Sequence, residues 1–193
     1  KKSKFRKFVL NFVKKSQIRK KFLKLRESKL QKVKSINHIN IIKLLKKKGI
    51  KGKIVGGYYP YNNELDCIQI LKKLEKKNYI ISLPKIKKNF QMDFIQWSTK
   101  EPLVVNKFGI PEPSIGKIKF PDILLVPLLS FDAKLNRVGY GGGYYDRYIH
   151  RIKRKKKPLL VGLAYSFQRV KSIPTNRYDK KLDFVVTERK IIE

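Results

Sequence analysis

The strongest constraint on this chain is a segment in its C-terminal third, where an apolar run leads through a glycine-rich turn into a helical pattern. The apolar run 123–126 has the length of a buried strand. Glycines occupy positions 139 and 141–143, and the sequence from Tyr144 to Ile149 is suited to a helix start. Glycines let backbone N–H groups approach an oxyanion, and a helix N-terminus adds partial positive charge. The segment therefore predicts a phosphate site, although its spacing matches neither a Walker loop nor a dinucleotide fingerprint.

Length and composition favour one globular domain. The chain has 193 residues, of which 41% are hydrophobic, which is enough for a sizeable core. No apolar run approaches the length of a membrane span. The single cysteine, Cys67, cannot form an internal disulfide, so we expect a reducing, cytoplasmic location and a small buried side chain on a helix.

The formal charge of +34 would normally suggest a nucleic-acid or membrane partner. The lysines are spread along the whole chain, however, and Ile and Asn are abundant too. AT-biased codon usage produces the same pattern on solvated faces, and part of the charge could still attract polyanionic substrates. No RNP-type or helix-turn-helix pattern is present. A basic nucleic-acid-binding protein nevertheless stays open as an alternative function.

Residues 1–14 are expected to be a dispensable basic extension, and residues 15–193 one domain. An amphipathic helix is predicted from Ser16, as N-cap, to Glu27. Lys15 and Arg19 form a basic pair one helical turn apart, which by itself indicates no more than a solvated helix face.

The remaining pattern alternates helices with strands and predicts an α/β sandwich with a mainly parallel sheet. Helices are expected at 36–48, which would include a surface His38 and stop at Gly49, and at 65–74. Strands are expected at 53–55, 79–84, 92–97 and 158–165, with a last strand after Asp183. The succession of strand, helix and strand over 53–84 implies a right-handed parallel crossover, and a ligand site is expected at the carboxyl ends of the strands.

The string from Arg137 to Tyr148, preceded by Val126-Pro127 and Phe131-Asp132, resembles the signature of the 5-formyltetrahydrofolate cyclo-ligase family, also called methenyltetrahydrofolate synthetases. The resemblance covers roughly residues 15–190. It implies a three-layer α/β/α fold similar to sugar-phosphate isomerases and coenzyme A transferases. It also implies conversion of 5-formyltetrahydrofolate to 5,10-methenyltetrahydrofolate, driven by ATP and Mg²⁺ with release of ADP and phosphate, through a phosphorylated formyl intermediate. Small-molecule partners and a monomer are expected.

The resemblance also implies roles for individual residues. Catalytic roles fall to Arg137 and Tyr144, and the magnesium carboxylates would be Asp146 and Asp179. The ATP-binding set is Lys15, Ser16, Gln17, Ile18, Arg19, Arg137, Val138, Gly139, Tyr140, Gly141, Gly142, Gly143, Tyr144 and Tyr145. The folate-binding set is Tyr59, Glu64, Tyr140, Gly141, Gly142, Gly143 and Tyr144.

Bland alternatives exist for several of these residues. Glu64 could merely favour the N-terminus of the following helix, and Asp146 could be a first-turn helix aspartate. Three apolar residues could line the pterin or simply belong to the core: Met92, Phe94 and Trp97. Asp183 is interpreted as structural.

The chain also departs from the family pattern at Leu128, a site often occupied by Gly, and at Tyr178, where His is frequent. These departures keep open a degenerate family member that binds folate or nucleotide without turnover.

Overall fold

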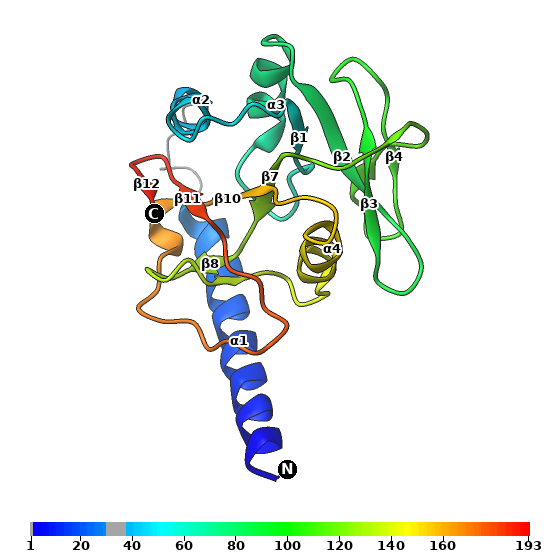
Figure 1. Ribbon diagram of the computed structural model, residues 1–193. Coiled ribbons are helices and arrows are strands. Elements are labelled where there is room, and N and C mark those ends of the chain that lie inside the picture. Colours follow the sequence, from blue (N-terminus) through cyan, green and yellow to red (C-terminus); the bar gives the residue numbers. More distant parts are fainter. Residues whose placement is uncertain (1, 30–37) are drawn as a thin grey trace.

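A computed structural model describes the backbone of residues 2–29 and 38–193, and the side chains of residues 14–29 and 40–193. The helices of these ranges surround a mixed eight-stranded sheet of order β12-β11-β10-β7-β1-β2-β3-β6 (Figure 1). The sheet strands are β1 (Ile54–Gly56), β2 (Ile80–Ile86), β3 (Met92–Gln96), β6 (Ile118–Lys119), β7 (Ile123–Pro127), β10 (Leu159–Leu163), β11 (Phe184–Val186) and β12 (Ile191–Ile192). Two small ribbons pair β4 (Val104–Val105) with β5 (Pro111–Glu112), and β8 (Ser130–Phe131) with β9 (Arg137–Val138).

The centre of the sheet is parallel and its edges are antiparallel. Strands β11, β10, β7, β1 and β2 pair in parallel, whereas β12, β3 and β6 run against their neighbours. The predicted parallel connection between β1 and β2 is therefore confirmed. The carboxyl ends of the central strands meet at one edge, where ligands bind in sheets of this kind.

Helices cover both faces of the sheet, which confirms the three-layer prediction. They are α1 (Lys2–Lys29), α2 (His38–Lys47), α3 (Cys67–Glu75) and α4 (Tyr144–Ile152). Successive residues of a strand point to opposite faces. In β7, Ile123 and Leu125 accordingly join the core under α2 and α3, while Leu124 and Val126 pack on the side of α4.

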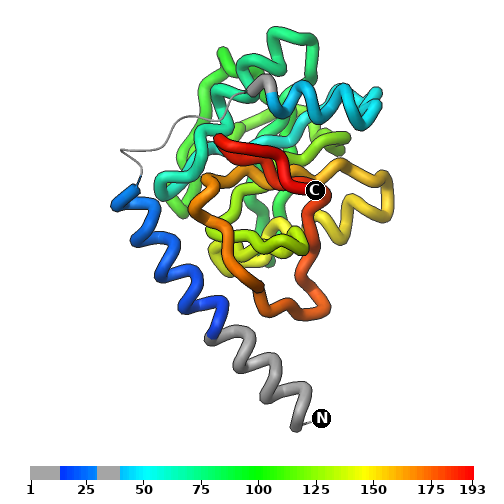
Figure 2. The backbone as a smooth tube through the Cα atoms, turned by 90° about the vertical axis from the view of Figure 1, so that its left-hand side faces the viewer, coloured from blue at the N-terminus to red at the C-terminus, as the bar shows by residue number. Residues whose placement is uncertain are grey.

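Helix α1 differs from its prediction. It is continuous from Lys2 to Lys29, so Ser16 lies inside the helix and is not an N-cap. A cap requires the preceding chain to leave the helix, and no Gly or Pro between residues 2 and 15 makes it do so. The boundary predicted at residue 15 therefore falls within a helix. Figure 2 shows the second half of α1 along one edge of the molecule, and this half contacts β8 and β9.

The boundaries of α2 and α3 can also be compared with their predictions. Helix α3 starts at Cys67, because the carboxylate of Asp66 caps it by accepting from the N–H groups of Ile68 and Gln69 at 2.9 and 3.3 Å. The predicted start at residue 65 was two residues early. Helix α2 ends before Gly49, whose φ is +59°, as expected. Its predicted start at residue 36 lies outside the described residues, and so does the side chain of His38.

The three apolar residues with a possible role at the pterin belong to the core instead. Met92, Phe94 and Trp97 are all buried, and the Phe94 ring lies 4.8 Å from that of Tyr148 on α4. Cys67 is buried on α3, as predicted. Among the described residues, no helix is long and apolar enough to cross a membrane.

The inner face of α3 gives a test of this packing. Leu71 is fully buried between α3 and the sheet, whereas Lys73 on the same helix is exposed. We expect Leu71→Ala to lower the free energy of unfolding by about 2–5 kcal/mol, because a cavity is left under the helix. Lys73→Ala should change it by less than about 0.5 kcal/mol. Urea unfolding measures both, and equal effects would contradict the assigned helix faces.

Candidate functional site

The loop that leads to the glycines is fixed by a buried aspartate. The β8–β9 ribbon follows the carboxyl end of β7, and between its strands Asp132 is only 2% exposed. Its carboxylate accepts from the backbone N–H groups of Lys134, Asn136 and Ile173 at 2.9–3.0 Å. The Phe131-Asp132 part of the sequence signature therefore has a structural role: it fixes the loop that leads to the glycine segment.

The glycine segment then turns into α4. Gly143 is the N-cap of α4 with φ +68° and offers no side chain to the first helical N–H groups. Gly141 has φ +106°, and a Cβ added there would lie 3.2 Å from the guanidinium carbon of Arg19. The loop thus presents backbone and a helix N-terminus beside a cation, which suits a phosphate.

One face of α1 supplies the cations. Lys15, Arg19 and Arg26 recur at helical spacing and all face the loops at the carboxyl edge. The Nε of Arg19 donates to the carbonyl of Gly139 at 2.9 Å. Gln17 is exposed, because it sits half a turn from Lys15 and Arg19, so the structure does not bring it to the loop. Ser16 and Ile18 are half-buried.

The two predicted metal carboxylates lie close together, and each is paired with a cation. Lys15 contacts Asp179 at 2.6 Å, and Arg137 contacts Asp146 at 2.9 Å. The Oδ1 of Asp146 also accepts from the backbone N–H of Lys180, the residue after Asp179. In the described part of the chain, no group of three or more His, Cys, Asp or Glu side chains could hold a metal alone.

A buried arginine that sequence reasoning missed lies deeper in the site. Arg26 is 2% exposed, and its guanidinium donates to the carbonyl of Leu128 and, at 2.9 Å, to the hydroxyl of Tyr140. The Tyr140 hydroxyl in turn donates to the carbonyl of Tyr61 at 3.1 Å. The signal in the sequence was its spacing, because Arg26 follows Arg19 by two helical turns.

Glu64 faces this arginine from the turn after β1. It is 8% exposed and accepts from the N–H of Tyr61 at 3.1 Å. Burial raises the pKa of Glu64 to about 7, and the nearby positive charge of Arg26 opposes the rise. Asp66, rather than Glu64, provides the side-chain cap of α3. Tyr59, predicted beside it, is about one-third exposed.

The tyrosines that begin α4 differ in how deeply their side chains are buried. The hydroxyl of Tyr145 and the Nε of Arg26 are buried and have no hydrogen-bond partner among the described residues. Burial, with the charge of Glu64 next, raises the pKa of Tyr145 far above its ordinary value. Tyr144 is half-buried at the start of α4, and Val138 is buried in β9.

The departures from the family pattern leave the glycine loop clear. The Leu128 side chain is buried in the core, where it would meet a Cβ added at Gly162. Tyr178 is 58% exposed, with the Arg177 guanidinium 4.7 Å above its ring.

Three other polar side chains have structural roles. The Gln168 amide donates to the carbonyls of Leu128 and Leu129, and Asp183 accepts from the N–H of Leu160 as interpreted. The carboxylate of Glu112 accepts from Ile86 N–H and from the Asn106 amide.

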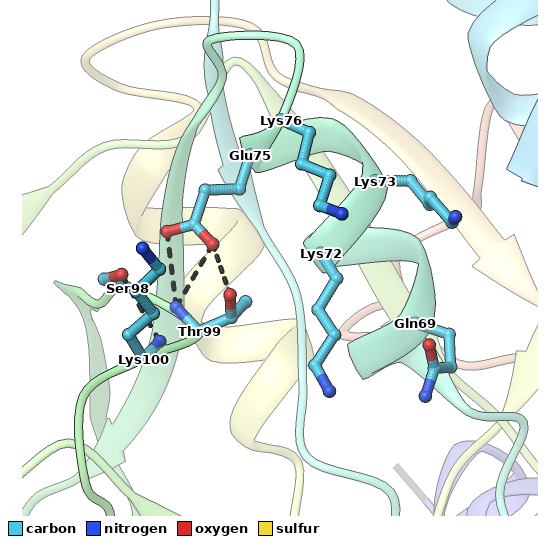
Figure 3. A pocket seen from close by; sticks show the side chains of 8 residues that line it. All are labelled: Gln69, Lys72, Lys73, Glu75, Lys76, Ser98, Thr99 and Lys100. Atoms are coloured by element: carbon cyan, nitrogen blue, oxygen red, sulfur yellow. Dashed lines mark hydrogen bonds between the residues drawn. The ribbon is translucent and has the colours of Figure 1, made fainter.

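A cleft of about 560 Å³ lies elsewhere, between α3 and the turn after β3 (Figure 3). Its lining includes Lys72, Lys73, Lys76 and Lys100, while Glu75 accepts from the backbone N–H of Thr99 at 3.2 Å. The last turn of α3 precedes β2, so this cleft is at the amino ends of the parallel strands, opposite the glycine loop.

Known proteins resemble this chain in sequence and in fold. The model of the 5-formyltetrahydrofolate cyclo-ligase family matches residues 11–188. The chain belongs to this family. It is 32% identical over 140 residues to the 5-formyltetrahydrofolate cyclo-ligase of Haemophilus influenzae, covering 68% of this chain and 74% of that protein. Identity to the Escherichia coli 5-formyltetrahydrofolate cyclo-ligase is 29% over 147 residues, covering 72% and 80%.

A solved structure matches as well. The 5,10-methenyltetrahydrofolate synthetase of Aquifex aeolicus superimposes with a TM-score of 0.70 at 31% identity, covering 92% of this chain and 91% of that one. The family prediction and the α/β fold prediction are thereby confirmed.

The raised pKa of Glu64 makes a stability prediction. Because the folded pKa of about 7 lies above the ordinary 4.5, the protonated carboxyl stabilises the fold below pH 4.5, and this stabilisation is lost as the pH rises through 7. We therefore compare the free energy of unfolding of the wild type with that of Glu64→Gln. The difference, wild type minus variant, should fall by up to roughly 3 kcal/mol between pH 4.5 and pH 7. Urea unfolding at several pH values measures it, and a constant difference would contradict the burial of an ionisable Glu64.

Proposed function

We propose that this chain catalyses the reaction for which its family is named, the ATP-driven conversion of 5-formyltetrahydrofolate to 5,10-methenyltetrahydrofolate. The observation that carries the proposal is the convergence of Lys15, Arg19 and Arg137 around the glycine loop. Cations around backbone N–H groups and a helix N-terminus suit the terminal phosphates of a nucleotide.

The reaction needs activation of a poor leaving group. The formyl oxygen attacks the terminal phosphorus of ATP, and the bond from that phosphorus to the bridging oxygen of ADP breaks. The second folate nitrogen then adds to the formyl carbon, the carbon–oxygen bond breaks, and phosphate leaves with that oxygen while the nitrogen loses its proton. Little covalent chemistry is required of the protein, so its residues contribute by positioning and by neutralising charge.

Each half of the site takes one substrate in this proposal. Lys15, Arg19 and Arg137 bind the phosphates, with Arg137 able to offer a two-pronged donor to the transferred group. The segment from Gly139 to Tyr145 provides backbone contacts, with Ser16 and Ile18 at its border. On the folate side, ionised Glu64 accepts from the N–H groups of the pterin, and Tyr59, Tyr140 and Tyr144 line the approach.

Asp146 and Asp179 fit a magnesium site of the usual kind, in which one or two carboxylates share the ion with phosphate oxygens and water. Asp146 accepts from Arg137 and Lys180 through its Oδ1. Asp179 accepts from Lys15 and from the N–H of Asn176 through its Oδ2. The other oxygen of each accepts no hydrogen bond within the described residues. When bound, Mg²⁺ would neutralise charge on the phosphates.

The proposed location is the cytoplasm, where ATP and reduced folates are found. A monomer suffices for the reaction, because the site residues named come from one chain.

Absorbance in the methenyl-folate band tests the activity directly. Purified protein is mixed with 5-formyltetrahydrofolate, with and without ATP and Mg²⁺. We expect the band to grow only when all are present. A flat trace with folded protein would refute turnover, and ligand-induced thermal stabilisation would then identify a degenerate folate or nucleotide binder.

The nucleic-acid alternative has the charge of +34 and the lysine-lined cleft in its favour. It predicts an RNA affinity that falls steeply with salt and does not respond to folate. We favour the enzyme because RNA binding leaves the paired carboxylates and the buried charges of Arg26 and Glu64 without a purpose.

The metal role predicts the phenotype of Asp146→Asn. The amide keeps an acceptor for the N–H of Lys180 but loses the charge, so kcat should fall about 100-fold or more and the Mg²⁺ concentration for half-maximal rate should rise. Asp183→Asn is the matched control, since within the described part of the chain the Asp183 carboxylate accepts only from the N–H of Leu160, and its turnover should stay near wild type. If thermal stability and turnover of Asp146→Asn fall together with no change in Mg²⁺ dependence, Asp146 is a helix and ion-pair residue only.

A further inference from the structure

The tip of the β2–β3 hairpin holds a large aromatic ring out in water. Asn89 and Phe90 both adopt the left-handed backbone region, with φ of +56° and +54°. This conformation is unfavourable for a bulky residue such as Phe. The Phe90 side chain is 61% exposed, so burial of its ring does not repay the strain.

Helix α4 fastens this tip to the glycine loop. The Nε of Arg147 donates to the carbonyl of Phe90 at 3.0 Å, and its Nη2 donates to the carbonyl of Gly142. One turn later, the Nη2 of Arg151 donates to the carbonyl of Met92 at 2.6 Å. Figure 1 shows α4 beside the loop that joins β2 to β3. A Cβ at Gly143 would come within 2.8 Å of Arg147, so the glycine makes room for this clasp.

Three rings from three separate segments gather here. The ring of Tyr144, at the start of α4, lies 6.0 Å from that of Phe90 and 6.4 Å from that of Phe108. The Arg147 guanidinium is 5.6 Å from the Phe90 ring and 5.7 Å from the Tyr144 ring. Phe108 is 44% exposed. Exposed aromatic rings that gather in one patch mark a binding surface, whereas single apolar residues scattered over a protein surface are ordinary.

We propose that Phe90 and Phe108 form, together with Tyr144, a stacking surface for a planar aromatic ring of one of the two substrates. Arg147 is the positioning residue that holds Phe90 over the glycine loop. The inference rests on the proposed cyclo-ligase function for the identity of the ring, which is the folate or the adenine of ATP. The direct bond from Arg147 to Gly142 joins this surface to the glycine loop, which is the proposed phosphate site.

Steady-state kinetics measures the contribution of the ring. Phe90→Ala should raise KM for one substrate about five- to tenfold, with kcat nearly unchanged, because the stack is made in both ground and transition states. Phe90→Trp should restore the wild-type KM. Ile115→Ala is the control for loss of an exposed apolar side chain, since Ile115 is 85% exposed in a loop outside this cluster. Unchanged KM for both substrates in Phe90→Ala would overturn the proposal.

A second readout does not require turnover. In Phe90→Trp, the new indole should change its fluorescence on addition of 5-formyltetrahydrofolate alone or of ATP with Mg²⁺ alone, and the responding ligand identifies the ring. Ile115→Trp corrects for absorption by the ligands. A response in a protein without turnover would support the surface and refute the enzyme. Turnover with no response to either ligand or to both together would refute the surface and leave the enzyme intact.

A double-mutant cycle tests the positioning role. If Arg147 acts through Phe90, Arg147→Ala should raise KM for the same substrate. In the double variant, KM should rise by a factor smaller than the product of the factors of the two single variants. Arg147→Lys should recover little, because Lys lacks the fork that reaches both carbonyls. Lys155→Ala is the matched control, since Lys155 lies 4.2 Å over the Phe120 ring outside the site. Multiplicative effects would contradict the clasp.

Discussion

The site depends on the burial of one charge. The guanidinium of Arg26 is almost fully removed from water, and an unpaired charge there would cost several kcal/mol. Its partners come from three segments: the carbonyl of Leu128 after β7, the hydroxyl of Tyr140 in the glycine segment, and the carbonyl of Asn62 at 3.4 Å. These bonds, which Nη1 and Nη2 of Arg26 donate, hold α1 across the carboxyl edge of the sheet. The helical period then carries Arg19 and Lys15 to the glycine loop, so one buried contact orients the cations that recognise phosphate.

Those cations are balanced against carboxylates in the structure. Lys15 pairs with Asp179 and Arg137 pairs with Asp146, so charges of both signs are held in place at short range. In the proposed reaction, phosphate and its counter-ion enter as a pair of opposite charges, and the cations and carboxylates exchange one set of partners for another. Such an exchange needs little reorganisation, which is the condition under which electrostatic stabilisation is most effective. The carboxylates therefore hold the cations in place before the ligand binds and, in the proposed reaction, bind its counter-ion afterwards.

The parts that could be predicted from sequence are those in which local pattern and global fold agree. The buried strands, the glycine loop and the family signature are of this kind. Ser16 was assigned wrongly because cap preference is local, while helix continuation was decided by the uninterrupted residues before it. Arg26 was missed because its partner Leu128 lies 102 residues away. The exposed Phe90 gave no signal either, since its backbone strain and its contact with α4 exist only in the folded chain.

The start of α4 shows why the glycine segment takes its particular form. Consecutive side chains leave the helix in different directions: Asp146 turns to Arg137 and Lys180 on the phosphate side, and Arg147 turns to the hairpin tip. Both sets of bonds hold only if the helix begins at one residue and in one orientation. A Cβ at Gly143 would lie 2.8 Å from a guanidinium nitrogen of Arg147, and one at Gly141 would lie 3.2 Å from the guanidinium carbon of Arg19, so either guanidinium would have to shift. The glycines thus do more than expose backbone to an anion. They let two cations from α1 and α4 approach the loop from opposite ends, which couples the phosphate half of the site to the aromatic half through a single turn of chain.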